Sequence, residues 1–266
     1  MARRGLPGLA VYELIASELG SKDLQQGKAN VFVKSDEDAD HPVVLHEYMA
    51  ARLAHSMGIP VPFGELATIQ RNAKAWATAI IGAHGEVSAP PNPLELSVAE
   101  PHIYAGIAVF DAWLLNIDRT DVNLIWTPDV GLWAIDHEQC FNGVDPRLPD
   151  ALKNCTGLVH CSQVYREAPP QPDLMQPWID LIRSHGKRWI NSACDAAVQR
   201  GLSSRARADQ YRRFLTSRAQ DISYLSTQTY KVHANDLFSV WPMASDDDGS
   251  NPCKEDPCKR TGSLSN

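Results

Sequence analysis

The most informative stretch of the sequence is Phe110-Asp-Ala-Trp-Leu-Leu-Asn-Ile-Asp-Arg-Thr-Asp-Val-Asn-Leu-Ile-Trp-Thr-Pro-Asp-Val-Gly-Leu-Trp-Ala-Ile-Asp136. Asp118 and Asn123 have the spacing D-x-x-x-x-N, which is typical of phosphoryl-transfer loops. In such loops the aspartate accepts the proton of a substrate hydroxyl and the asparagine binds magnesium. The spacing alone is weak evidence, since Asp and Asn also favour caps and turns after a helix.

A β-hairpin is predicted after Asn123, because apolar runs flank the turn-forming segment Thr127–Gly131. Pairing around the centre of that segment predicts that Trp126 faces Trp133 and that Asn123 faces Asp136. Magnesium prefers oxygen ligands, so these two facing side chains form a candidate metal pair.

The first 81 residues predict a small sheet with one helix. The expected elements are strands at 30–35, 63–69 and 75–81 and a helix from Val43 to Met57 that ends at Gly58. Lys34 ends the first strand and Glu47 lies in the helix, so an ion pair between them would place a cation near nucleotide phosphates. Taken alone, a lysine at a strand end is usually a solvated surface charge.

The density of chain breakers in residues 82–101 predicts a boundary between two lobes. Beyond it, helices are expected at about 102–115, 174–199 and 202–228, with interruptions at Pro177, near Gly186 and at Gly201. An arginine-rich solvated face is expected on the last of these helices, made of Arg205, Arg207, Arg212, Arg213 and Arg218.

These patterns predict an α+β chain in three parts. Residues 1–85 form a β-rich N-terminal lobe that clamps a nucleotide, and residues 86–243 form a larger helical catalytic lobe. Residues 244–266 have almost no apolar side chains and are expected to be a disordered tail.

Taken together, the motifs resemble the HipA-like kinase family, a bacterial branch of the protein-kinase-like fold whose catalytic loop is similar to that of phosphoinositide kinases. The resemblance runs from about Asn30 to Phe141, through Phe-Val-Lys34, Leu-His-Glu47, Gly58-Ile-Pro-Val-Pro62, the D-x-x-x-x-N loop and Leu-Trp-Ala-Ile-Asp136-His. It implies a two-lobed protein-kinase-like fold, ATP and Mg²⁺ as cofactors, and transfer of phosphate to a serine or threonine hydroxyl. It also implies Asp118 as general base, Asn123 and Asp136 as metal ligands and Lys34 as the phosphate contact.

One departure from the protein-kinase pattern leaves other functions open. No G-x-G-x-x-G precedes Lys34, so Gly20 and Ser21, or the pair Gly27-Lys28, are the candidates for backbone N–H groups around the phosphates. The alternatives are a kinase acting on a small molecule or a lipid head group, and a pseudokinase that binds nucleotide without turnover. The hydroxyl acceptor is therefore an unknown protein or small molecule.

Composition excludes several classes of protein. The chain has 266 residues, of which 44% are hydrophobic and 21% charged, as in ordinary globular proteins. Its net charge of −7 disfavours nucleic acid as a direct ligand. Apolar stretches stay well short of the roughly 18 residues that a membrane span needs. With no signal-peptide pattern and six irregularly spaced cysteines, we expect a cytoplasmic enzyme with reduced thiols.

Overall fold

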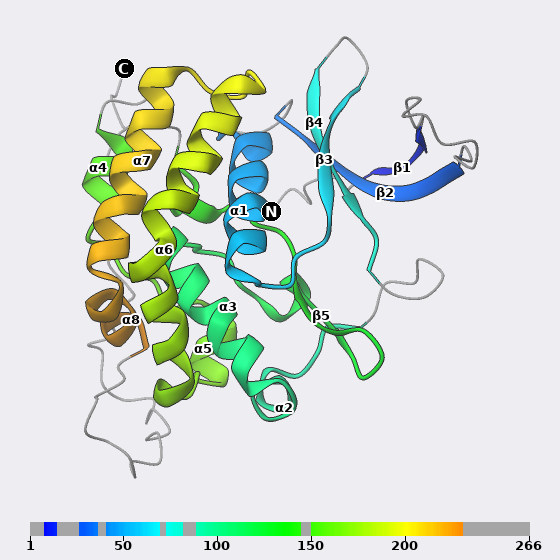
Figure 1. The fold of residues 1–266 in the computed structure, drawn as a ribbon. Helices are drawn as coiled ribbons and strands as arrows, with labels where there is room; N and C mark the ends of the chain where they lie inside the picture. Colours follow the sequence, from blue (N-terminus) through cyan, green and yellow to red (C-terminus); the bar gives the residue numbers. More distant parts are fainter. Residues whose placement is uncertain are drawn as a thin grey trace, which may run out of the picture.

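A small sheet lies beside a larger helical body in the computed structural model (Figure 1), which describes residues 8–14, 27–36, 41–69, 73–81, 89–144 and 150–230. The predicted phosphate-binding positions Gly20 and Ser21 and the expected tail, residues 244–266, lie outside these described residues. This mixed α+β architecture agrees with the predicted fold class.

The sheet is antiparallel throughout, in the order β1-β2-β4-β3. Its strands are β1 (Gly8–Leu14), β2 (Gly27–Ser35), β3 (Gly64–Thr68) and β4 (Lys74–Ala79). The last three agree with the strands predicted at 30–35, 63–69 and 75–81, whereas β1 was not predicted. Lys34 pairs with Trp76 of β4 near the end of β2, so its backbone is held within the interior of the sheet.

Helix α1 (Val43–Met57) connects the sheet to the helical body and has the bounds that the sequence predicts. It ends at Gly58, whose φ of 81° is left-handed and costs least for a glycine. The helix packs against β4 on one side and α6 on the other, and this explains why it is buried almost all round. Glu47 is therefore a buried carboxylate.

Helix α3 (Pro101–Leu114) is the centre of the helical body and packs against α6, α7 and α8. The other helices are α2 (Pro93–Ala99), α4 (Ala151–Cys155), α5 (Gln163–Glu167), α6 (Pro172–Gln199), α7 (Arg205–Gln220) and α8 (Ile222–Tyr230). Helix α2 falls in the segment that was predicted as a lobe boundary. Within the described ranges, no helix combines the length and apolar character that crossing a membrane requires.

Helix α6 continues through Pro177 and Gly186, so the predicted interruptions at these two positions are wrong. Its buried face runs unbroken from Met175 to Ala197, and this packing outweighs the local cost of a proline and a glycine. The predicted break at Gly201 is confirmed, because α6 ends at Gln199 and α7 begins at Arg205.

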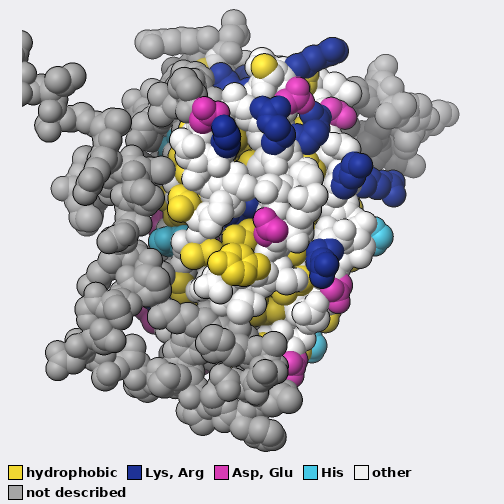
Figure 2. Space-filling view, turned by 90° about the vertical axis from the view of Figure 1, so that its left-hand side faces the viewer, with side chains coloured by type: hydrophobic (Ala, Val, Ile, Leu, Met, Phe, Trp, Pro, Cys, Tyr) yellow, Lys and Arg dark blue, Asp and Glu magenta, His cyan; other side chains and the backbone are white. Residues whose placement is uncertain are grey.

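The expected arginine face of α7 needs one correction. Arg218 is fully buried, and its guanidinium donates to backbone carbonyls rather than pointing to solvent. Figure 2 shows Lys and Arg side chains exposed on one face of the molecule, and both Arg205 and Arg213 are among the exposed residues. The arginine-rich pattern on α7 therefore combines surface charges with one buried structural group.

Strands β5 (Leu124–Thr127) and β6 (Gly131–Ala134) form the predicted hairpin, but its register differs by one residue. Trp126 pairs with Leu132, not with Trp133, and Asn123 hydrogen-bonds Ile135 instead of facing Asp136. The cause is the turn: Val130 N–H bonds Thr127, and Gly131 follows with a left-handed φ of 72°. Such three-residue hairpin loops add a position to one strand.

Candidate active site

Four charged side chains from three parts of the chain meet at one point. The ammonium of Lys34 lies 2.7 Å from Glu47 Oε1, 2.6 Å from Asp136 Oδ1 and 3.3 Å from Glu138 Oε2. Strand β2 supplies the lysine, α1 supplies Glu47, and the segment after β6 supplies the other two carboxylates. The predicted Lys34–Glu47 ion pair is present, and the structure adds Asp136 to it directly.

The local electrostatics keep Lys34 positively charged. Burial by itself lowers the pKa of Lys34, but the carboxylates of Glu47, Asp136 and Glu138 raise it above its ordinary value overall. Burial raises the pKa of Glu47, and the neighbouring Lys34 opposes that rise. Three carboxylates around one ammonium leave an excess of negative charge, which a cation or a ligand with a bound cation would balance.

The residues of the D-x-x-x-x-N loop follow α3. Asp118 is exposed, and its backbone N–H donates to Asn116 Oδ1 at 3.2 Å, a local hydrogen bond typical of asparagine in loops. Asn123 is buried, and its Nδ2 donates to the backbone carbonyl of Asp118 at 2.6 Å. The amide nitrogen of Asn123 is thus occupied, and its Oδ1 is the atom suited to a cation.

Asp136 has a left-handed backbone conformation, with a φ of 58°. Aspartate tolerates this region better than most residues, and such strained positions cluster at functional sites. Its side chain is one-third exposed (33%), and Oδ1 is the oxygen bonded to Lys34. Among the described residues no hydrogen bond to Oδ2 is found, so this oxygen is available to a ligand.

These donors fit a magnesium ion. Asn123 and Asp136 offer an amide oxygen and a carboxylate oxygen, the hard donors that magnesium takes together with water and phosphate. The carboxylate oxygens of Glu47, Asp136 and Glu138 lie within 4.8 Å of one another, so Glu138 is a further oxygen donor beside Asp136. Sequence reasoning missed Glu138, although its place two residues after Asp136 was the available signal.

Arg119 is the most deeply buried charge of the site. It bonds Asp111 through Nε at 2.9 Å and Nη2 at 3.1 Å, and its Nη1 donates to the backbone carbonyls of Asn123 and Ile135. The partner of the Arg119 guanidinium is therefore a carboxylate, that of Asp111. The same Asp111 accepts hydrogen bonds from Asn116 and from the hydroxyl of Tyr165. Sequence reasoning missed this network, in which Tyr165 lies 54 positions away from Asp111.

Two buried histidines connect the site to its surroundings. His46 Nδ1 lies 2.9 Å from the backbone oxygen of Glu138, and its Nε2 lies 2.8 Å from the hydroxyl of Tyr211 on α7. His137 lies beside Glu47, which accepts its backbone N–H at 3.1 Å. Burial, followed by the positive charges of Arg119 and Lys34, lowers the pKa of His137 well below its ordinary value. This lowered pKa favours the neutral form of His137.

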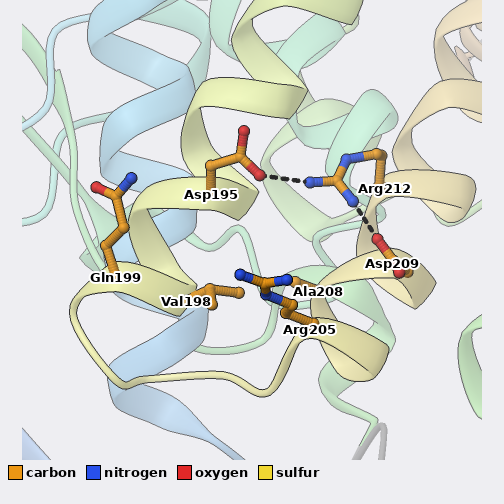
Figure 3. A pocket seen from close by; sticks show the side chains of 7 residues that line it. All are labelled: Asp195, Val198, Gln199, Arg205, Ala208, Asp209 and Arg212. Atoms are coloured by element: carbon orange, nitrogen blue, oxygen red, sulfur yellow. Dashed lines mark hydrogen bonds and ion pairs between the residues drawn. The ribbon is translucent and has the colours of Figure 1, made fainter.

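A surface cavity of about 410 Å³ lies elsewhere, between the end of α6 and the start of α7 (Figure 3). Asp195, Val198, Gln199, Arg205, Ala208, Asp209 and Arg212 line it. Inside it Arg212 is already paired with Asp195, at 2.8 Å, and with Asp209. None of these residues belongs to the cluster around Lys34, so the cavity is separate from the candidate active site.

Comparison with known proteins agrees with this geometry. Residues 25–146 match the family model described as HipA-like kinase, which confirms the resemblance seen in the motifs. Among curated proteins no match is found.

Two solved structures are similar to this chain. The Helicobacter pylori proinflammatory kinase CtkA gives a TM-score of 0.54 at 13% sequence identity, covering 76% of this chain and 91% of that chain. HipA of Shewanella oneidensis MR-1, solved with HipB and operator DNA, gives a TM-score of 0.43 at 14% identity, covering 86% of this chain and 67% of that chain. The likeness to CtkA confirms the predicted kinase-like fold.

Proposed function

We propose that this chain is an ATP- and magnesium-dependent phosphotransferase acting on serine or threonine hydroxyls of a protein. The premise is the match of residues 25–146 to the HipA-like kinase family model. The observation that carries the proposal is the convergence of Lys34, Glu47 and Asp136 at distances of 2.6 and 2.7 Å. The loop that holds Asp118 and Asn123 is joined to the same hairpin by hydrogen bonds.

Each residue has a role in the proposed reaction. Asp118, exposed on its loop, accepts the proton of the acceptor hydroxyl as the oxygen attacks the γ-phosphorus of ATP. The bond between that phosphorus and the bridging oxygen breaks, and ADP leaves. Lys34 neutralises phosphate charge, and Glu47 fixes the position of the lysine.

Magnesium would be held by Asn123 and Asp136, and when bound it supplies charge neutralisation at the phosphate oxygens. The protein contributes mainly position and electrostatics, because phosphoryl transfer requires little covalent chemistry from side chains. The hydrogen bond to the backbone carbonyl of Asp118 orients Asn123 for this task. The ion pair with Lys34 orients Asp136.

Incubation with [γ-³²P]ATP and magnesium tests the proposal. We expect acid-stable label on serine or threonine of the protein itself or of proteins in a bacterial lysate, and none when both Asp118→Ala and Asp136→Ala are present. Label that appears only in the small-molecule or lipid fraction would replace the protein acceptor with the alternative kinase function. An active double variant, or nucleotide binding with no loss of γ-phosphate over hours, would overturn the proposed turnover.

A further inference from the structure

We propose that Arg119 is a positioning residue that sets the spacing between Asn123 and Asp136. The inference rests on the proposed function for the role of these two side chains as magnesium ligands. The geometry that carries it is a single buried guanidinium that bonds the backbone next to both of them.

The guanidinium of Arg119 joins the two ends of the hairpin. Its Nη1 donates to the carbonyl of Asn123 at 2.9 Å and also to the carbonyl of Ile135, the residue before Asp136. The Ile135 N–H in turn donates to the carbonyl of Asn123 at 3.1 Å. One nitrogen therefore fixes the start of β5 and the end of β6 relative to each other.

Helix α3 anchors the other edge of the guanidinium. Asp111 accepts hydrogen bonds from Nε and Nη2 of Arg119, in the paired geometry that suits a guanidinium and a carboxylate. The hydroxyl of Tyr165 donates to Asp111 at 2.6 Å and the amide of Asn116 at 2.9 Å, so the carboxylate cannot rotate freely. The hairpin ends are thus tied to a rigid helix rather than to another loop.

The base is held by the same anchor because Arg119 follows Asp118 in the chain. The backbone N–H of Arg119 donates to Ser162 Oγ at 3.3 Å, and this fixes the peptide between the two residues. Through one residue the fold thereby positions Asp118, Asn123 and Asp136 together. Outer groups that orient metal ligands typically cost about 10- to 100-fold in metal affinity or activity when they are removed.

A lysine cannot replace this arginine. The lysine side chain is shorter and carries its charge and donors on one nitrogen atom. The Arg119 guanidinium instead bonds a carboxylate along one edge and two backbone carbonyls along the other. Arg119→Lys keeps the charge beside Asp111 and removes the bridge to the hairpin, so it separates the positioning role from charge balance.

Arg218 provides a matched control. It is also fully buried, and it donates to the carbonyls of Ala112 and Trp113 at the end of α3 and to those of Thr156 and Leu158. It does not bond the hairpin. Arg218→Lys therefore disturbs the same helix end to a similar degree without touching the backbone beside Asn123 or Asp136.

The test compares purified full-length chains carrying Arg119→Lys or Arg218→Lys. For Arg119→Lys we expect the magnesium concentration that gives half-maximal phosphate transfer to rise about 10-fold or more, with ATP binding in EDTA within about 2-fold of wild type. For Arg218→Lys we expect a lower Tm with an unchanged magnesium requirement. A magnesium requirement within 2-fold of wild type in Arg119→Lys, or the same rise in both variants, would overturn the inference.

Hydrogen exchange separates failure of this inference from failure of the proposed function, because it needs no nucleotide or turnover. Amides of residues 121–136 should exchange at least ~10-fold faster in Arg119→Lys and at the wild-type rate in Arg218→Lys. If Arg119→Lys does not fold, Tyr165→Phe removes one bond to Asp111 and should raise exchange in the same segment at least ~2-fold. Unchanged exchange of that segment overturns the inference even in a chain that transfers phosphate.

Discussion

Lys34 Nζ and Asp136 Oδ1 are 2.6 Å apart although 102 positions separate the two residues in the sequence. The ion pair neutralises the carboxylate that the proposed reaction assigns to magnesium. Binding of a nucleotide with its metal would give each partner a new neighbour, phosphate for Lys34 and the cation for Asp136. Lys34 alone does not balance the negative charge of Glu47, Asp136 and Glu138, and a bound cation would offset the remainder.

Replacement of the proposed base should remove catalysis and leave the fold intact. Asp118 is exposed, so Asp118→Asn is expected to change the free energy of unfolding by less than about 0.5 kcal/mol. Loss of a general base should lower kcat by about 10²- to 10⁴-fold. Initial rates with [γ-³²P]ATP and far-UV circular dichroism measure the two effects.

The matched control is Asp121→Asn in the same loop, whose side chain accepts the N–H of Val122. It should keep kcat within about 3-fold of wild type. Equal losses in both variants would assign the effect to the loop backbone and contradict the role of Asp118.

Removal of Lys34 should destabilise the protein through the buried partner it leaves behind. In Lys34→Met the carboxylate of Glu47 stays buried without its cation, with an expected cost of about 2 kcal/mol, since Lys34 itself is partly exposed. The double variant Lys34→Met/Glu47→Leu should be more stable than the sum of the two single changes by about 1 kcal/mol or more. Urea unfolding of the four proteins measures this coupling.

The second change, Glu47→Leu, should restore part of the stability lost in Lys34→Met but not the binding of ATP. The double variant is expected to bind ATP as weakly as Lys34→Met, because the phosphate contact is lost in both. Lys153→Met, on a lysine whose side chain is 80% exposed, is the control and should alter neither property. Purely additive stabilities would mean that Lys34 and Glu47 do not share one ion-pair network.

Magnesium and nucleotide should bind cooperatively. Magnesium alone is expected to raise Tm by less than about 1 °C, because Lys34 competes for Asp136, whereas ATP with magnesium should raise it by several degrees at saturation. Chelation by EDTA should remove most of that increase. Differential scanning fluorimetry measures all three conditions, and an equal increase from ATP in EDTA would contradict Asn123 and Asp136 as metal ligands.

Alkaline pH should unfold the protein through its buried tyrosines. Burial raises the pKa values of Tyr104, Tyr165 and Tyr230, and the charge of Asp111 adds to the rise in each. Since the folded pKa values exceed the unfolded value of about 10, stability is intact below about pH 10 and is lost as pH rises through the folded values. Absorbance at 295 nm, followed together with far-UV circular dichroism, measures ionisation and unfolding.

The full tyrosinate signal should therefore appear only when the helical signal is lost. Tyr224→Phe replaces an exposed ring and should leave the alkaline midpoint unchanged. A complete tyrosinate signal at native ellipticity would contradict the burial of the three rings.

Short-range sequence patterns predicted the elements whose limits depend on neighbouring residues. Helix α1 has its expected limits because apolar spacing defines its body and Gly58 defines its end. The pairing of Lys34 with Glu47 was predicted from a lysine at the end of a strand and a glutamate in the helix that follows it, and the structure places the two groups 2.7 Å apart. Their order along the chain carried that information.

The hairpin register was predicted incorrectly because it depends on the conformation of a single residue. Gly131 takes a left-handed φ and the turn gains a residue, so Asn123 pairs with Ile135. Spacing alone cannot distinguish two-residue from three-residue loops.

The arginines were harder to assign because burial is a property of the whole fold. Arg213 and Arg218 lie on the same helix and look alike in sequence, yet the first is exposed and the second is fully buried. The partners of Arg218 belong to α3 and to residues 156–158, far away in the chain. No window of local sequence contains them.

Hydrogen bonds from α7 and α8 to α1 and α3 determine when during synthesis the site can mature. Tyr211, Arg218 and Tyr230 bond to His46, Trp113 and Ala108, respectively. A ribosome-bound chain that has been translated only as far as α6 already contains every residue of the cluster around Lys34 and of the loop at Asp118, but it lacks these supports. The supports of the site are therefore expected to form only after α8 has left the exit tunnel.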